Sequence, residues 1–70
     1  MLEDIRGLLG KEPFEPFVIV TSSGEKYPVE DPYNVAMMEG RIFYVFPHSR
    51  KWVFIRVNQI TALETAEPAV

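Results

Sequence analysis

The chain has no cysteine and a single histidine, His48, among its 70 residues. Disulfide bridges are therefore excluded, and a structural zinc site, which takes about four Cys or His ligands, is not expected. We expect neither a metal nor any other cofactor. Without such supports, a domain this small must depend on a well-packed core or on self-association.

Long apolar runs are also lacking. No stretch approaches the roughly 20 apolar residues that cross a bilayer, and MLEDIRGLLG at the N-terminus opens with acids instead of the bases of a secretory leader. We therefore expect one domain over residues 1–70, cytoplasmic and without membrane association.

Acidic side chains are missing from residues 40 to 63, which carry Arg41, Arg50, Lys51 and Arg56. The remainder has three bases against ten acids, a charge of −7, so these four bases bring the whole chain to −3. Two interpretations fit this asymmetry. The basic segment forms a positive face that binds an anion, or it complements the acidic remainder within the fold or between subunits.

Apolar and turn-forming residues predict one helix followed by short strands. Helical spacing of leucine and isoleucine predicts a helix over about 2–10. Strands are expected over about 17–21, 26–30, 41–46, 52–57 and 60–64, with a frayed tail over 65–70. The segment VAMM, residues 35–38, fits either a strand or one helical turn.

The strands RIFYVF and WVFI are apolar at every position, so both of their faces must be covered. We predict a mainly β fold: a short N-terminal α-helix followed by a five-stranded, strongly bent small barrel. Closing the barrel covers one face of the strands. The helix, the Pro-Phe segment or another subunit must cover the other.

Two Pro-Phe pairs precede the first strand, in KEPFEPF. Pro13 and Pro16 force an extended connector, because residues before proline avoid the helical conformation. We predict that Phe14 and Phe17 belong to the core of the small barrel. The other interpretation is an exposed aromatic docking patch.

The segment VFIRVNQITAL, residues 53–63, resembles the second motif of the Sm-like proteins, the Sm and Hfq family. The residues that fall in register with that motif are Ile55, Arg56, Asn58, Ile60 and Leu63. Val57 departs from it, because the family has glycine there. Upstream, VIVTSSGEKYPV is similar to the start of the first Sm motif, whose second glycine, where the long second strand bends, corresponds to Val29.

Most of the chain is also similar to a group of very short bacterial proteins. They share a PF-x-PF pattern, a turn glycine, a following proline and a final I-T-x-[IL]-E, here in residues 11–20, 24–32 and 60–64. No activity is assigned to that group. This second resemblance therefore implies a shared fold only.

The Sm-like resemblance implies a ring in which the fourth strand of one subunit pairs with the fifth strand of the next. It also implies single-stranded RNA as a ligand at the pore, contacted by Arg56 and Asn58. The loop PHSRKW adds His48, Arg50 and Lys51 as further candidates for RNA binding, beside an aromatic residue that can stack on a base.

Catalytic motifs are not apparent. His48 stands beside Ser49, but the partners of a catalytic triad meet through the fold and not through adjacency in sequence. We therefore expect a non-catalytic binding or assembly module, a homo-oligomer joined through strand edges. The expected edge residues are Trp52, Phe54, Ile55, Thr61 and Leu63. The alternative is an Sm-like RNA-binding ring, and the third interpretation is a small enzyme.

Overall fold

The computed structural model describes residues 2–65, which form one α-helix, six β-strands and two short 3₁₀ turns. The helix α1 spans Leu2–Leu9. The strands are β1 (Phe17–Thr21), β2 (Lys26–Val29), β3 (Val35–Met38), β4 (Arg41–Val45), β5 (Trp52–Arg56) and β6 (Ile60–Thr65). The 3₁₀ turns are η1 (Pro32–Asn34) and η2 (Val57–Gln59).

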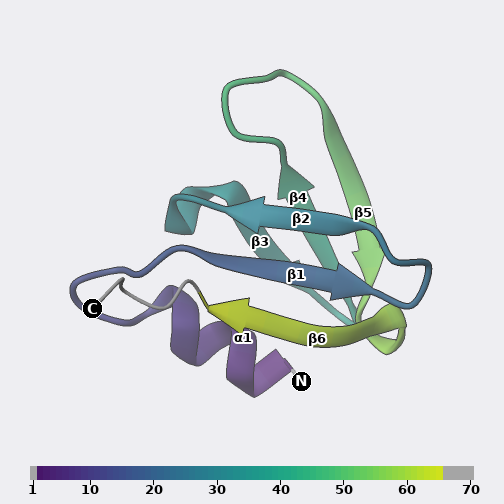
Figure 1. The fold of residues 1–70 in the computed structure, drawn as a ribbon, viewed down its shortest axis with the longest axis horizontal. Coiled ribbons are helices and arrows are strands. Elements are labelled where there is room, and N and C mark those ends of the chain that lie inside the picture. Colours follow the sequence, from purple (N-terminus) through teal and green to yellow (C-terminus); the bar gives the residue numbers. More distant parts are fainter. Residues whose placement is uncertain (1, 66–70) are drawn as a thin grey trace.

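Sheet A has the strand order β2-β1-β6, and every pair in it is antiparallel (Figure 1). β1 and β2 form a hairpin whose turn contains Gly24 at φ 88°, a conformation that residues with a Cβ rarely adopt. The β1–β6 register shifts between Val20 and Thr21, where a bulge lets β6 bend away from the hairpin.

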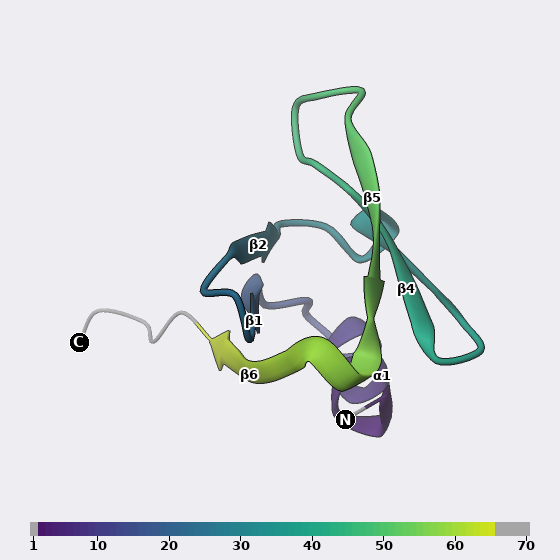
Figure 2. The same ribbon diagram turned by 90° about the vertical axis from the view of Figure 1, so that its right-hand side faces the viewer.

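Sheet B has the order β3-β4-β5 and is also antiparallel. Figure 2 shows it standing upright beside sheet A, with α1 at the base of the space between them. Ile5 of α1 is fully buried there, so the helix closes one end of the core. The loop of the β4–β5 hairpin extends beyond the rest of the molecule.

The structure has six strands where five were predicted, because VAMM, which fitted either a strand or one helical turn, forms a strand of its own after β2. Between them the Asp31 side chain accepts a hydrogen bond from the Tyr33 backbone N–H, and Asn34 Oδ1 accepts from the N–H groups of Glu30 and Asp31. These contacts form a capping box that stabilises η1 and interrupts the strand. VAMM then pairs with β4 as strand β3.

A mainly β fold with a short N-terminal helix is confirmed, but the closed barrel is not. Residues 2–65 form two separate three-stranded sheets that face each other across one core. Both sheets contribute fully buried side chains to that core, including Ile19 and Val29 from sheet A and Ile42 and Tyr44 from sheet B.

Phe17 is 1% exposed and lies in this core, and Phe14 packs against it with the ring centroids 6.2 Å apart. The prediction that these phenylalanines belong to the core is confirmed for Phe17, and Phe14 is partly buried and packs against the core cluster. The Phe14 ring of the connector is therefore directed inward.

Two further expectations concern the C-terminal tail and the absence of a membrane-spanning helix. The frayed tail was predicted from 65, but Thr65 ends β6, and residues 66–70 lie outside the described part. Among residues 2–65 there is no helix long and apolar enough to cross a membrane.

We predict that Phe17→Ala costs about 3–5 kcal/mol of stability, because it removes a ring from the centre of a small core. Chemical denaturation monitored by circular dichroism measures this loss. Phe14→Ala is the matched control and should cost less, since the Phe14 ring is only partly buried. Equal losses for the two variants would contradict this assignment of the core.

Candidate interaction surface on sheet B

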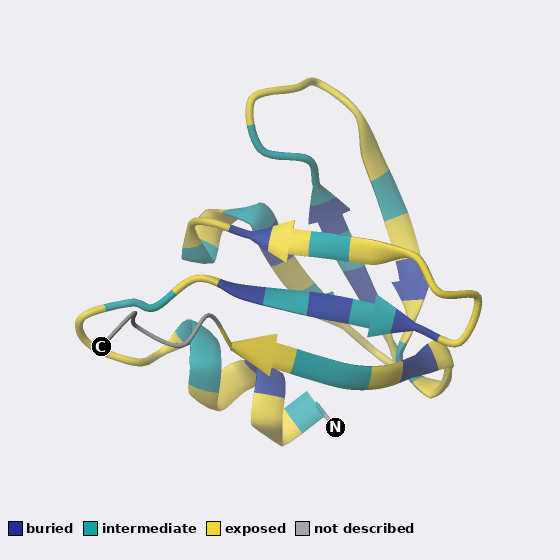
Figure 3. Ribbon diagram, in the orientation of Figure 1, coloured by how far each residue is buried: buried dark blue, intermediate teal, exposed yellow. Residues whose placement is uncertain are grey.

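Side chains of sheet B alternate between the core and the opposite, outer face, as the pleat of a strand requires. In β4, Ile42 and Tyr44 are buried, and in β5, Ile55 is buried. Figure 3 shows this alternation along β5. The outer face therefore carries Ala36 and Met38 from β3, Arg41, Phe43 and Val45 from β4, and Trp52, Phe54 and Arg56 from β5.

Phe43, Trp52 and Phe54 form an aromatic cluster on this outer face. Their ring centroids lie 5.3 to 5.7 Å apart, within the usual range for aromatic pairs. Trp52 is 55% exposed and Phe54 is 50% exposed, and Met38 on β3 is 53% exposed. An apolar surface of this kind indicates an interaction site.

Arg41 and Arg56 are direct cross-strand partners at one end of the outer face. Like charges directly opposite each other destabilise an antiparallel pair. Among the described residues, neither guanidinium forms an ion pair with a carboxylate. This arginine pair therefore favours an anionic group from outside the domain.

A shallow depression adjoins the arginine pair. It is lined by Glu39, Gly40, Arg41, Arg56, Val57 and Asn58. Val57 begins η2, and its N–H donates to the Gly40 carbonyl at 3.1 Å. The two residues that the Sm-like motif indicated for RNA, Arg56 and Asn58, thus lie at one place, beside Arg41.

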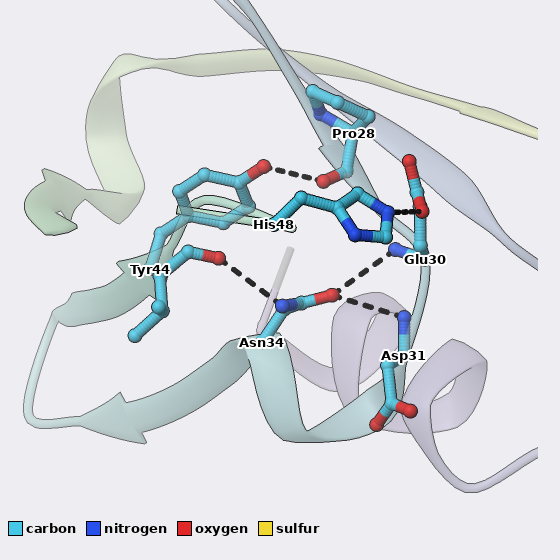
Figure 4. Close-up of polar contacts among 7 residues, drawn as sticks. Pro28, Glu30, Asp31, Asn34, Tyr44 and His48 are labelled. Carbon is cyan, nitrogen blue, oxygen red and sulfur yellow. Dashed lines mark hydrogen bonds and ion pairs between the residues drawn. The ribbon is translucent and has the colours of Figure 1, made fainter. Parts of the chain in front are cut away.

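The other candidates for RNA binding lie at the opposite end of the β4–β5 hairpin. His48 Nε2 is 3.1 Å from Glu30 Oε1 (Figure 4), and Lys51 Nζ lies 5.1 Å from the centroid of the Phe46 ring. Arg50 is exposed in the same loop. The five predicted residues therefore form two groups, separated by the length of the hairpin.

Figure 4 also shows how Asn34 of η1 is joined to sheet B, and how sheet B is joined to sheet A beside it. Asn34 Nδ2 donates to the Val45 carbonyl at the end of β4, at 3.2 Å. The Tyr44 hydroxyl donates to the Pro28 carbonyl of β2, a direct link between sheet B and sheet A. Burial, with the nearby Glu30 carboxylate and Tyr27, raises the pKa of Tyr44 to about 12.

β5 is an open edge of sheet B, and its pairing with β4 shows which backbone groups are free. Phe46 N–H donates to the Lys51 carbonyl at 2.9 Å. The Val57 N–H to Gly40 carbonyl bond marks the other end of the same ladder. In an antiparallel ladder, hydrogen-bonded and non-hydrogen-bonded pairs alternate. Lys51 and Val57 are bonded to the residues that flank β4, so every second residue between them has backbone groups that point away from β4. They are Trp52, Phe54 and Arg56.

The five residues predicted for a strand edge take different positions. Trp52 and Phe54 are exposed on the outer face, whereas Ile55 is 4% exposed and belongs to the core. On β6, Thr61 is exposed and donates its hydroxyl to the Val20 carbonyl at 3.3 Å. Leu63 packs against the core cluster. β6 itself is one of the two edge strands of sheet A, and β2 is the other.

Sequence reasoning did not identify Phe43 as a surface residue, whereas one of the two interpretations of the charge already placed Arg41 on a positive face. The continuous apolar pattern of β4 and β5 concealed which positions face outward, since alternation of polar and apolar residues is the usual signal. Tyr33, in η1, is 92% exposed. The DPYN sequence predicted a break in the chain, but it did not predict that the tyrosine side chain would be almost fully exposed.

No protein-family model matches the chain, and no curated protein or solved structure matches it significantly. Within residues 2–65, no three His, Cys, Asp or Glu side chains gather in a way that could hold a metal ion.

Stability should fall as the pH rises from about 10 through about 12. Tyr44 has a pKa of about 12 in the folded state and 10.0 as a free side chain, so its ionisation favours the unfolded chain in this window. Denaturation midpoints measured across that pH range test this. Tyr44→Phe should make the decline in stability shallower. Part of the decline should remain, because burial and Glu25 also raise the pKa of Tyr27. An unchanged pH profile in Tyr44→Phe would contradict the assignment.

Proposed function

We propose that this chain is a non-catalytic binding and assembly module that self-associates through the open strand edges of β5 and β6. The observation that carries the proposal is the state of the β5 edge. Edge strands in monomeric proteins are commonly protected by lysine, proline or bulges. β2 has such protection, Lys26 and Pro28, whereas β5 has neither residue and presents free backbone groups over Trp52–Arg56.

The edge strands β5 and β6 belong to different sheets and are joined in the chain only by η2. If β5 of one copy pairs with β6 of the next, the contact is heterologous, and repetition gives a ring or a filament. The small size of the core supports this arrangement, because a second copy adds apolar burial that the single chain lacks.

We further propose that the fold is a variant of the Sm-like barrel. That resemblance implies one long second strand that bends. β2 and β3 follow each other in the chain, lie in different sheets and are separated only by η1 and its flanking residues, which supports their interpretation as two halves of such a strand. Pro28 and the capping box at Asp31 then take the place of the bend glycine.

Phe54→Pro should convert the assembly to monomers, because proline removes an N–H that points to the open edge. The β4–β5 ladder should survive, since that N–H is not part of it. Phe54→Ala is the matched control: it loses the same ring but keeps the N–H, and should still associate. Light scattering over a tenfold concentration range measures the mass of each variant.

Two results would contradict edge pairing. One is a monomeric mass for the unmutated chain over the whole concentration range. The other is an equal mass for Phe54→Pro and Phe54→Ala, with both variants folded by circular dichroism, since the free N–H would then have no part in association.

A second candidate function, binding of single-stranded RNA, is favoured by one specific observation. The arginine pair, Arg41 and Arg56, adjoins Asn58 at one depression and has no carboxylate partner among the described residues. Such a cationic depression suits a phosphate, and phosphate contacts supply much of the affinity for nucleic acids.

Arg56→Ala should weaken binding of a single-stranded oligoribonucleotide and reduce its salt dependence by about one phosphate contact. Fluorescence anisotropy of a labelled oligonucleotide at several salt concentrations measures both quantities. Arg6→Ala, which removes the same charge from α1, is the control. Absence of binding to the unmutated protein even at low salt would eliminate this candidate.

A further inference from the structure

Four large hydrophobic side chains are exposed among the described residues: Tyr33, Met38, Trp52 and Phe54. Three of them lie on the outer face of sheet B. The fourth, Tyr33, is the most exposed at 92% and lies in η1, between β2 and β3 (Figure 1). The chain thus has an aromatic cluster and, apart from it, one projecting aromatic ring.

The backbone that carries Tyr33 is held in place. Its own N–H donates to Asp31 Oδ1 at 2.9 Å, and Asn34 joins η1 to β4 through the Val45 carbonyl and to the chain before η1 through Glu30 and Asp31 (Figure 4). A ring on a fixed turn loses little backbone freedom on binding, which is the property of an interface anchor.

The charges around the two surfaces are opposite. Tyr33 is accompanied by the exposed carboxylates of Asp31 and of Glu30, one oxygen of which lies 3.1 Å from His48 Nε2. The aromatic cluster is accompanied by the arginine pair, Arg41 and Arg56, which has no carboxylate partner within the described part of the chain. A carboxylate brought between these two guanidinium groups would relieve their cross-strand repulsion.

We propose that the outer face of sheet B receives η1 of a second copy of this chain, with Tyr33 packed on the aromatic cluster and the adjacent carboxylates beside the arginine pair. This inference rests on the proposed self-association and names a side-chain contact for it, distinct from the backbone contact of the β5 edge. The contact is heterologous, because η1 and the outer face are different surfaces of one chain.

A second copy fits this face better than a nucleic acid does. Two guanidinium groups neutralise few phosphates, whereas one carboxylate is enough to relieve the repulsion between them. Met38 and Ala36 extend the apolar surface, as a protein partner requires and a phosphate backbone does not. Two copies meeting face to face would instead place four arginines together.

The test uses Trp52, the single tryptophan of the chain, as the reporter. Tyr33→Ala keeps Trp52 and the receiving face but lacks the projecting ring. Trp52→Ala is invisible in tryptophan fluorescence but keeps η1. Titrating Trp52→Ala into Tyr33→Ala should change the emission of Trp52, because one intact contact forms between the two variants.

The control partner is the double variant Tyr33→Ala/Trp52→Ala. It retains the strand edges and differs from Trp52→Ala only by the loss of the Tyr33 ring. It should need at least a tenfold higher concentration for the same change, as is usual when an interface anchor is truncated. Tyr33→Phe/Trp52→Ala keeps the ring and should behave like Trp52→Ala. Both substituted side chains are largely exposed, so the variants should stay folded, which circular dichroism verifies.

Identical titrations with and without the Tyr33 ring would overturn this contact while leaving edge pairing intact. A monomeric unmutated chain would instead overturn self-association as a whole. Quenching of Trp52 by a single-stranded 12-mer oligonucleotide, with no response to Trp52→Ala protein, would assign the face to a nucleic acid and also reject the proposal.

Discussion

The hydrogen bond from the Tyr44 hydroxyl to the Pro28 carbonyl joins the two sheets, and the rest of the structure is arranged around it. It lets the phenol of Tyr44 lie fully buried in the core. There the centroid of the Tyr44 ring is 5.3 Å from that of Tyr27 and 5.0 Å from that of Phe46. A buried hydroxyl without a partner would cost about 1–3 kcal/mol. The bond therefore fixes which face of β4 points inward.

Once Tyr44 points inward, Phe43 must point outward, together with its neighbours on β5. Within residues 2–65, α1 and the Pro-Phe connector close the core, and no element covers the outer face of sheet B. The outer face, the open β5 edge and the arginine pair thus lie together on one side of the molecule. An assembly module requires this combination: a rigid body, a free edge and an apolar surface that another copy can cover.

The sequence predicted a mainly β chain with an N-terminal helix and identified Phe17 as core, because β-branched runs, prolines and helical spacing are local signals. It did not predict β3, whose existence depends on the capping box at η1 and on pairing with β4. Arg56 and Asn58 were found through a motif, whereas Arg41 joins them only by cross-strand register. The 92% exposure of Tyr33 could not be predicted, because exposure is decided by the whole fold and not by the residues around it.

Amide hydrogen exchange at Trp52, Phe54 and Arg56 tests the central claim most directly, that the β5 edge joins copies of this chain. These backbone N–H groups point away from β4 and have no partner strand in the single domain. If copies pair along β5, their exchange should slow as protein concentration rises, while the amides of Val53 and Ile55, already bonded to β4, should change little. Fast exchange at these three positions, unaffected by concentration, would contradict the account.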